Sequence, residues 1–181
     1  MEIKGEYRIA ASRDKVFAAL NDPAVLQACI PGCESLQKLS DTEMTAKVRL
    51  RIGPVSAAFS GKVTLSDIDP PNGYRISGAG EGGVAGFAKG GAKVLLVDAE
   101  GGTLLRYDVE AHVGGKIAQL GSRLIDGVAK SMADKFFANF AEAARAGAPI
   151  VEAPAAATAP TTPQHQSWIR RIWEWFMSLW R

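Results

Sequence analysis

Two cysteines and two histidines are the residues best suited to redox, metal or nucleophilic chemistry in this chain. Cys29 and Cys33 stand in the segment CIPGC, where the Pro-Gly pair indicates a turn. A zinc site needs more soft ligands than two, and His112 and His165 have no ligand spacing relative to the cysteines. We therefore interpret the thiols as structural or incidental, expect no metal site, and keep a functional thiol pair as the lesser alternative.

The glycine-rich segment GAGEGGVAGFAKGG, residues 78–91, resembles a phosphate-binding loop. Gly78, Gly80 and Gly83 match G-x-G-x-x-G, but a dinucleotide site needs a helix next, whereas AKVLLVD has the pattern of a strand. The lysine-serine pair of a P-loop is also absent. The segment instead predicts a mobile or bulged hairpin, with Phe87 as its one large apolar residue.

Acid-base catalysis finds no support in the remaining polar residues. Asp67 and Asp69 precede a Pro-Pro turn, where acidic residues serve the turn itself. Ser60 and Ser77 have no histidine at a motif spacing, and His112 falls on the predicted solvent face of a strand. The net charge is only +2, which gives no reason to expect nucleic acid as a partner. We expect a protein that is not an enzyme.

The elements that would position a site are mostly strands with a period of two. Apolar and polar side chains alternate along residues 3–9, 44–52, 55–65 and 105–112. A turn signal, Pro-Pro-Asn-Gly at 70–73, separates two of them. Alternation with one apolar side predicts an antiparallel sheet that has one solvated face.

Three helices are expected. Ser12 begins a short helix, a second short one follows Pro23, and a long helix is predicted from about Ile117 to Arg145. Apolar residues recur every fourth position of the long helix, as Leu120, Leu124, Val128, Met132, Phe136 and Phe140. The order predicts an α+β helix-grip fold, in which a curved antiparallel sheet wraps around a long C-terminal helix, as in START and Bet v 1-like proteins.

Small inward residues on the sheet predict a cavity between sheet and helix, although the helix could also fill that space. These small residues are Gly5, Ala46, Ala57, Gly61, Gly78 and Ala111. Such a cavity would suit an apolar ligand. Its expected walls are Phe59 and Tyr107 from the sheet, Phe87 from the glycine-rich mouth, and Leu124, Val128 and Met132 from the helix. The Tyr107 hydroxyl could donate to a ligand carbonyl or, as we slightly favour, satisfy a backbone group.

Composition changes near Gly147 and divides the chain into three parts. Residues 1–146 form the helix-grip domain, and residues 147–166, rich in proline, alanine and threonine, are expected to be a disordered linker. Residues 167–181 then form an amphipathic helix. The start of the chain, MEIKGEYRIA, does not resemble a signal peptide, so a cytoplasmic location is expected.

The tail, WIRRIWEWFMSLWR at 168–181, contains all four tryptophans. On a helical wheel its polar residues share one arc, and its apolar residues fill the rest. A helix of about 21 Å is too short to cross a ~30 Å hydrocarbon core, so we interpret it as an interfacial membrane anchor rather than a span. The lesser alternative is a helix docked on its own domain or on a partner. The anchor residues are Trp168, Ile169, Arg170, Arg171, Ile172, Trp173, Trp175, Phe176, Leu179 and Trp180.

Several segments resemble the CoxG-like family of carbon monoxide dehydrogenase subunits over residues 1 to about 145. These are IPGCESL, GEGGVAGFAKGGAKVLL, GGTLLRYDVEAHVGGK, IAQLGSRLID and ADKFFANF. The resemblance implies a helix-grip fold and an accessory role beside a molybdenum hydroxylase of the aerobic CO dehydrogenase type. It further implies recruitment of that enzyme to the cytoplasmic face of the membrane, where its electrons reach the respiratory chain.

Two functions of different classes follow. The protein is either a membrane-recruitment adaptor without a ligand, or also a carrier whose cavity takes a quinone from the membrane and presents it to the enzyme. In both cases the partners are the hydroxylase and membrane lipid, and no covalent cofactor is expected. A helix-grip enzyme acting on an apolar substrate is a third alternative, which the missing acid-base residues disfavour.

Overall fold

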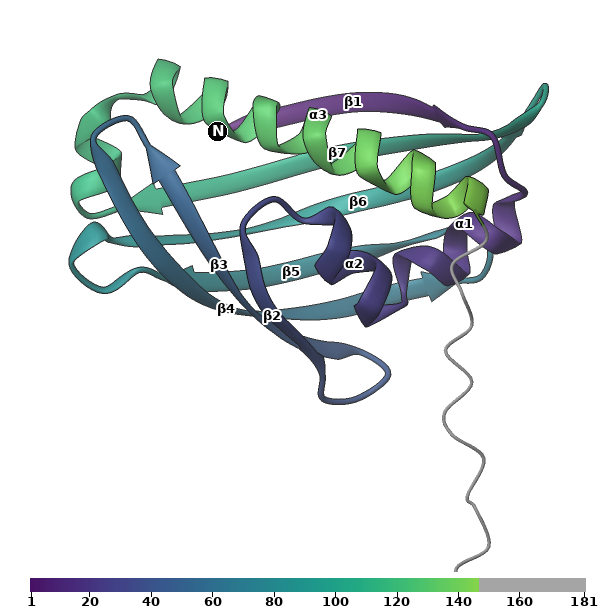
Figure 1. Cartoon of the computed structure of the whole chain (residues 1–181), viewed down its shortest axis with the longest axis horizontal. Coiled ribbons are helices and arrows are strands. Elements are labelled where there is room, and N and C mark those ends of the chain that lie inside the picture. The colour runs from purple at the N-terminus through teal and green to yellow at the C-terminus, as the bar shows by residue number, and fades with distance from the viewer. Residues whose placement is uncertain (147–181) are drawn as a thin grey trace, which may run out of the picture. The chain divides into compact units, whose positions relative to one another are not determined.

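The chain folds as one strand, two short helices, six further strands and a long helix in a computed structural model that describes residues 1–146 (Figure 1). The expected linker at 147–166 and the expected anchor at 167–181 lie outside the described residues. The elements are β1 Glu2–Ile9, α1 Arg13–Leu20, α2 Pro23–Cys29, β2 Cys33–Lys38, β3 Glu43–Ile52, β4 Val55–Asp69, β5 Gly73–Glu81, η1 Gly83–Ala85, β6 Phe87–Ala99, β7 Gly102–Gly114, η2 Lys116–Leu120 and α3 Ser122–Ala146.

All seven strands belong to one antiparallel sheet with the order β1-β7-β6-β5-β4-β3-β2. The sheet curls, and α3 runs across its concave side, which is the predicted helix-grip arrangement (Figure 1). The first strand pairs with the last, from Glu2 opposite Glu110 to Ile9 opposite Thr103. The α+β fold class expected from the alternation of side chains is therefore confirmed.

Local signals in the sequence explain where the elements begin and end. Asp22 caps α2, because its carboxylate accepts hydrogen bonds from the amides of Ala24 at 2.8 Å and Val25 at 3.4 Å. A two-residue turn joins β3 to β4, with Ile52 opposite Val55. Gly53 takes a φ of 57° in this turn, and left-handed backbone of this kind favours glycine.

The long helix begins later than predicted. Residues 116–120 form the short helix η2, and α3 starts only at Ser122, because Gly121 adopts a φ of 87° and interrupts the helical backbone. Ile117 is buried in η2 and packs in one cluster with Ile52 and Ala85. Ile117 is therefore apolar because it belongs to the core at this end of the domain, and not because it is part of the long helix.

A larger core lies at the other end of the domain, where α1, α2 and the C-terminal half of α3 meet the sheet. Ile9, Val16, Leu105 and Phe140 are almost completely buried there. The side-chain amide of Asn139 also donates to the carbonyl of Cys29 at 3.1 Å, which ties α3 to the end of α2. The two clusters fix α3 at both ends and leave its middle over the concave face of the sheet.

Candidate ligand-binding cavity

An apolar cavity of about 610 Å³ lies between the concave face of the sheet and the middle of α3. Its size falls within the range of pockets that hold small organic ligands, roughly 300–1,000 Å³. The hydroxyls of Tyr74 and Tyr107 are the only side-chain polar groups among the described residues that line it. Charged or strongly polar ligands would lose their hydration in this cavity without gaining partners, so its chemistry suits a lipid-like molecule.

Alternation along the strands builds most of the walls. From β3 all five inward positions predicted from the sequence line the cavity, Met44, Ala46, Val48, Leu50 and Ile52. The strands β4, β5, β6 and β7 contribute their inward side chains in the same way. Of the small residues expected to create space, Ala46 and Gly61 line the cavity, and Gly80, Ala88 and Ala92 join them. Gly5, Ala57, Gly78 and Ala111 lie elsewhere on the sheet.

Three of the six predicted wall residues are brought together. Phe59 from β4, Tyr107 from β7 and Met132 from α3 all line the cavity. Sequence reasoning missed the contribution of α2 and β2, which supply Leu26 and Leu36, and that of the aromatic pair Phe136 and Phe137 on α3. Phe136 carried a signal, because it belongs to the same four-residue repeat as Met132.

Leu124 and Val128, the other two predicted helix residues, lie outside the cavity. They line a separate groove between α3 and β3, and Leu124 is 39% exposed. An α-helix turns 100° per residue, so a row with a spacing of four advances about 40° at each step. Leu124 and Phe140 are four steps apart and consequently face almost opposite directions, which is why only the later part of the row reaches the core.

Phe87 also differs from the prediction, because it lies on the outer side of the sheet and is 44% exposed. Ala88, the next residue of β6, lines the cavity, and neighbouring side chains of a strand point to opposite faces. The aromatic ring of Phe87 covers Gly114, where an added Cβ would collide with it. The pairing of β5 with β6 is continuous up to Phe87, so the expected bulge is absent from this hairpin.

Tyr107 belongs to an aromatic stack that connects the cavity wall to the surface. Its ring lies 5.3 Å from that of Phe137, which in turn lies 4.2 Å from the ring of Tyr7. The hydroxyl of Tyr7 donates to the carboxylate of Asp134, which is exposed. Burial raises the pKa of Tyr107, while the neighbouring hydroxyl of Tyr7 acts in the opposite direction. Whether the Tyr107 hydroxyl serves a ligand carbonyl or a backbone group stays a prediction.

Metal and thiol chemistry have little structural basis in residues 1–146. Within this range, no group of three or more His, Cys, Asp or Glu side chains could hold a metal ion. Cys29 and Cys33 are free thiols, and burial raises the pKa of both, which lowers their reactivity at neutral pH. His112 is exposed, as the alternation of its strand predicted. None of the described helices is long and apolar enough to cross a membrane.

The sequence profile of one family, described as the CoxG subunit of carbon monoxide dehydrogenase, matches residues 5–145. The chain belongs to this family. CoxG is named as a subunit that accompanies carbon monoxide dehydrogenase, and membership indicates an accessory role of that kind. No curated protein matches the sequence.

Solved structures of other proteins share the fold of this chain. A conserved protein from Geobacillus kaustophilus is 30% identical, with a TM-score of 0.76 over 81% of this chain and 96% of that one. A protein from Thermus thermophilus is 14% identical, with a TM-score of 0.61 over 82% of this chain and 99% of that one. Ara h 8.0201 is 17% identical, with a TM-score of 0.56 over 81% of this chain and 98% of that one. It shares the Bet v 1-like helix-grip fold.

Proposed function

We propose that this CoxG family member is a non-catalytic accessory protein that carries a quinone or similar lipid in its cavity. In this role it recruits a molybdenum hydroxylase of the CO dehydrogenase type to the cytoplasmic face of the membrane. There it couples the enzyme to the respiratory chain. The hydroxylase and membrane lipid are the two partners that this function requires.

The composition of the cavity walls is the observation that carries the proposal. A pure adaptor has no use for about 610 Å³ of apolar space, because empty volume in a core costs stability. The polyisoprene tail of a quinone needs a long apolar lining with few polar groups, and Tyr74 and Tyr107 are the only described residues of this lining that have any. The family assignment supplies the other half of the argument, since it points to a redox enzyme as the partner.

The physical problem solved by such a carrier is one of solubility. An enzyme in the aqueous phase needs an electron acceptor, whereas a respiratory quinone is confined to the bilayer by its apolar tail. A protein that shields the tail in a closed, apolar space removes that barrier, because transfer of the tail costs little once its surface is buried. The protein's own residues then bind and orient the quinone and exclude water, and the enzyme supplies the electrons.

The test is to fill the cavity and measure the bound lipid. Ala92 lines the cavity from β6, and Ala92→Phe adds a ring to the space that a ligand would occupy. Ala79 is exposed on the adjacent strand β5, so Ala79→Phe adds the same ring to the outer face and serves as the matched control. Both proteins are purified from quinone-containing cells, and the extracted lipids are quantified by mass spectrometry.

We expect lipid at near-stoichiometric amounts in the wild type and in Ala79→Phe, and at least ten-fold less in Ala92→Phe. Circular dichroism confirms that each variant is folded before lipids are compared. Wild-type protein that reproducibly contains no lipid would refute the carrier role and leave the adaptor without a ligand. Equal lipid in both variants would place the ligand outside this cavity.

A further inference from the structure

A second concave feature lies beside the cavity, between α3 and β3. This groove has a volume of about 390 Å³, and Pro31, Leu50 and Met132 line both it and the cavity. Four of its lining residues are basic, Arg49, Arg51, Arg123 and Lys135, and none of the described lining residues is acidic. We call it the basic groove. It attracts anions, because like charges gathered around a concave surface reinforce each other's potential.

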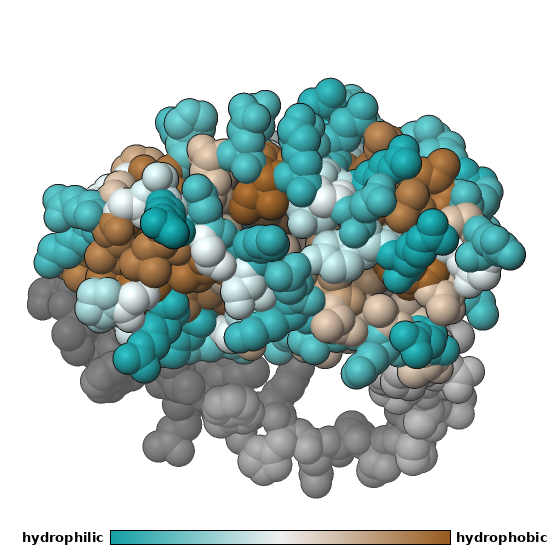
Figure 2. Space-filling model, turned by 90° about the horizontal axis from the view of Figure 1, so that it is seen from above, coloured by the Kyte–Doolittle hydropathy of each residue, from teal (hydrophilic) through white to brown (hydrophobic). Residues whose placement is uncertain are grey.

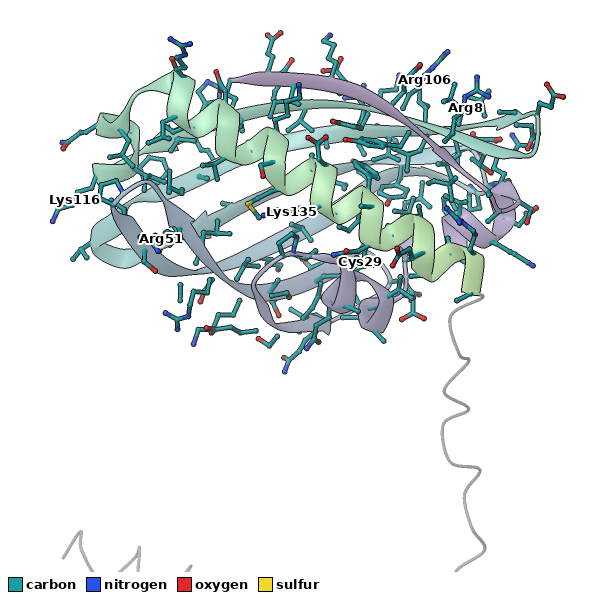
Figure 3. The ribbon with its side chains drawn as sticks, turned by 45° about the horizontal axis from the view of Figure 1, so that its top comes forward. Arg8, Cys29, Arg51, Arg106, Lys116 and Lys135 are labelled. Carbon is teal, nitrogen blue, oxygen red and sulfur yellow. The ribbon has the colours of Figure 1, made fainter. Side chains whose placement is uncertain are left out.

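Ion pairs leave most of this positive charge uncompensated. Arg49 is the exception, since its guanidinium lies 2.7 Å from the carboxylate of Glu34. Within residues 1–146, Arg51, Arg123 and Lys135 form no ion pair. In Figure 3, Arg51 and Lys135 lie on β3 and α3 on either side of the groove. Three exposed cations thus face one groove without a described partner.

Exposed apolar side chains lie at the same end of the domain. Leu124 lines the basic groove and is 39% exposed, and its side chain lies over Gly53 in the turn between β3 and β4. Val84, in the short helix η1 whose Ala85 packs with Ile52, is 86% exposed. Figure 2 shows hydrophobic residues gathered at the left end of the visible face with hydrophilic residues around them. Basic residues around exposed apolar ones are typical of surfaces that bind anionic membranes.

We propose that the basic groove binds the phosphate headgroups of anionic lipids, so that the domain itself docks on the membrane surface. Docking at this site brings the neighbouring cavity to the bilayer, where an apolar ligand enters and leaves. The site lies within residues 1–146, so it acts in addition to any anchor in the tail. The proposal assumes the membrane partnership proposed above but does not require that the cavity ligand is a quinone.

An acidic patch on a partner protein is the competing occupant. We favour lipid because Leu124 adds exposed apolar surface to the groove itself and Val84 adds more at the same end of the domain, which an anionic bilayer accommodates in its interfacial region. An acidic protein surface would complement the charges but would leave these side chains in contact with polar groups. The two occupants give different results in the experiment below.

The experiment measures vesicle binding of the full chain in a background with Trp173→Glu and Trp175→Glu, which removes the expected insertion of the tail. The groove variant combines Arg51→Gln, Arg123→Gln and Lys135→Gln. Its matched control, Arg8→Gln, Lys93→Gln and Arg106→Gln, removes the same charge from the outer face of the sheet, which carries Arg8 and Arg106 away from the groove (Figure 3). Vesicles of phosphatidylcholine alone are compared with vesicles that also contain phosphatidylglycerol, at low salt.

We expect the control to keep the preference of the background protein for anionic vesicles. The groove variant should lose most of it, because each cation near an anionic surface contributes about five-fold to binding, and three together up to about 100-fold. Equal losses in groove variant and control, or no loss in either, would overturn the proposal. A groove variant that binds vesicles normally but no longer binds the hydroxylase would also overturn it, in favour of a protein-binding groove.

A second measurement locates the binding and guards against misfolding of the variant. In the unmodified full chain, amide NMR shifts are followed during titration with dihexanoyl-phosphatidylglycerol, dihexanoyl-phosphatidylcholine and inorganic phosphate. Shifts at Gly32 and Gly127, both in the groove, with the anionic lipid only are the expected result. Equal shifts with free phosphate would identify a simple anion site and refute lipid docking.

The lipid that co-purifies with the groove variant is quantified as well. This measurement distinguishes a loss of membrane docking from a loss of the carrier function.

Discussion

Gly5 shows how a single missing carbon atom shapes the wall of the cavity. It pairs with Tyr107 across β1 and β7, and the phenol ring of Tyr107 lies directly over it. A Cβ at position 5 would lie 2.5 Å from the tyrosine hydroxyl and 2.7 Å from the ring carbon that carries it. The absence of that atom lets the ring lie flat against the strand and leaves the cavity open.

Gly5→Ala should therefore destabilise the domain by about 1–3 kcal/mol, because overpacking forces the Tyr107 ring out of its place. The ring lines the cavity, so its displacement changes the space for a ligand, and bound lipid should fall together with stability. Urea unfolding monitored by circular dichroism measures the first effect, and lipid extraction measures the second. A variant that is as stable as the wild type would mean that the ring moves without cost and that Gly5 does not set its position.

At the scale of elements, α3 contains a glycine whose replacement should have the opposite effect on stability from the replacement of Gly5. Gly127 lies inside the helix, is exposed, and has no heavy atom within 4 Å of an added Cβ. Glycine in a helix interior costs about 1 kcal/mol relative to alanine, because it loses more backbone freedom on folding. No described residue packs closely against Gly127, so nothing in the described structure offsets this cost.

Gly127→Ala should accordingly stabilise the domain by roughly 0.5–1 kcal/mol. The midpoint of urea unfolding would rise, with an unchanged dependence on denaturant concentration. The new methyl group also lies in the basic groove, so NMR titration with the anionic lipid can be repeated on a more stable protein. A loss of stability would show that the backbone at this position is not ordinary helix.

Strands were easier to predict than the long helix, for a geometric reason. A period of two assigns each side chain to a face for the whole length of β3, so its five inward residues, 44 to 52, follow directly from the sequence. A helix of 3.6 residues per turn has no such exact repeat, and the row from Leu124 to Phe140 changes face along its length. The prediction that Phe87 lines the cavity was wrong because it considered only the hydrophobicity of the residue. Its neighbour Ala88 points into the cavity, so Phe87 must point to the other face of the sheet.

The basic groove could not be predicted at all, because its residues come from segments far apart in the sequence. Arg51 belongs to β3, whereas Arg123 and Lys135 belong to α3, and only the packing of the helix beside the strand brings them together. Each of them looks like an ordinary solvated charge in its own element. The cavity, by contrast, was predictable in outline, since small and apolar inward residues on neighbouring strands already indicated empty space.

The distribution of tryptophan makes a test of the whole molecule simple. All four tryptophans lie between residues 168 and 180, outside the described residues, and the domain itself has none. The tryptophan fluorescence of the full chain thus reports only on the proposed anchor. A blue shift on addition of vesicles would mark the transfer of these side chains into an apolar environment.

Truncation after Gly147 should leave a folded, soluble domain whose co-sedimentation with liposomes falls sharply. The domain keeps both core clusters and the whole sheet, so its unfolding midpoint should change little. Any binding that survives should depend on anionic lipid and disappear in salt, since only the basic groove would then contribute. Truncated protein that binds as strongly as the full chain would exclude the tail as the main anchor.

The pairing of β1 with β7 has a consequence for how the protein is made. Ile9 finds its partner Thr103 only after roughly a hundred residues, which takes about 5–20 s at ordinary rates of synthesis. During that time the first strand leaves the ribosome without a neighbour, and its alternating charges, including Lys4, Glu6 and Arg8, keep its unpaired edge from pairing with other nascent chains. The strand that is synthesised first is therefore among the last to be incorporated into the sheet.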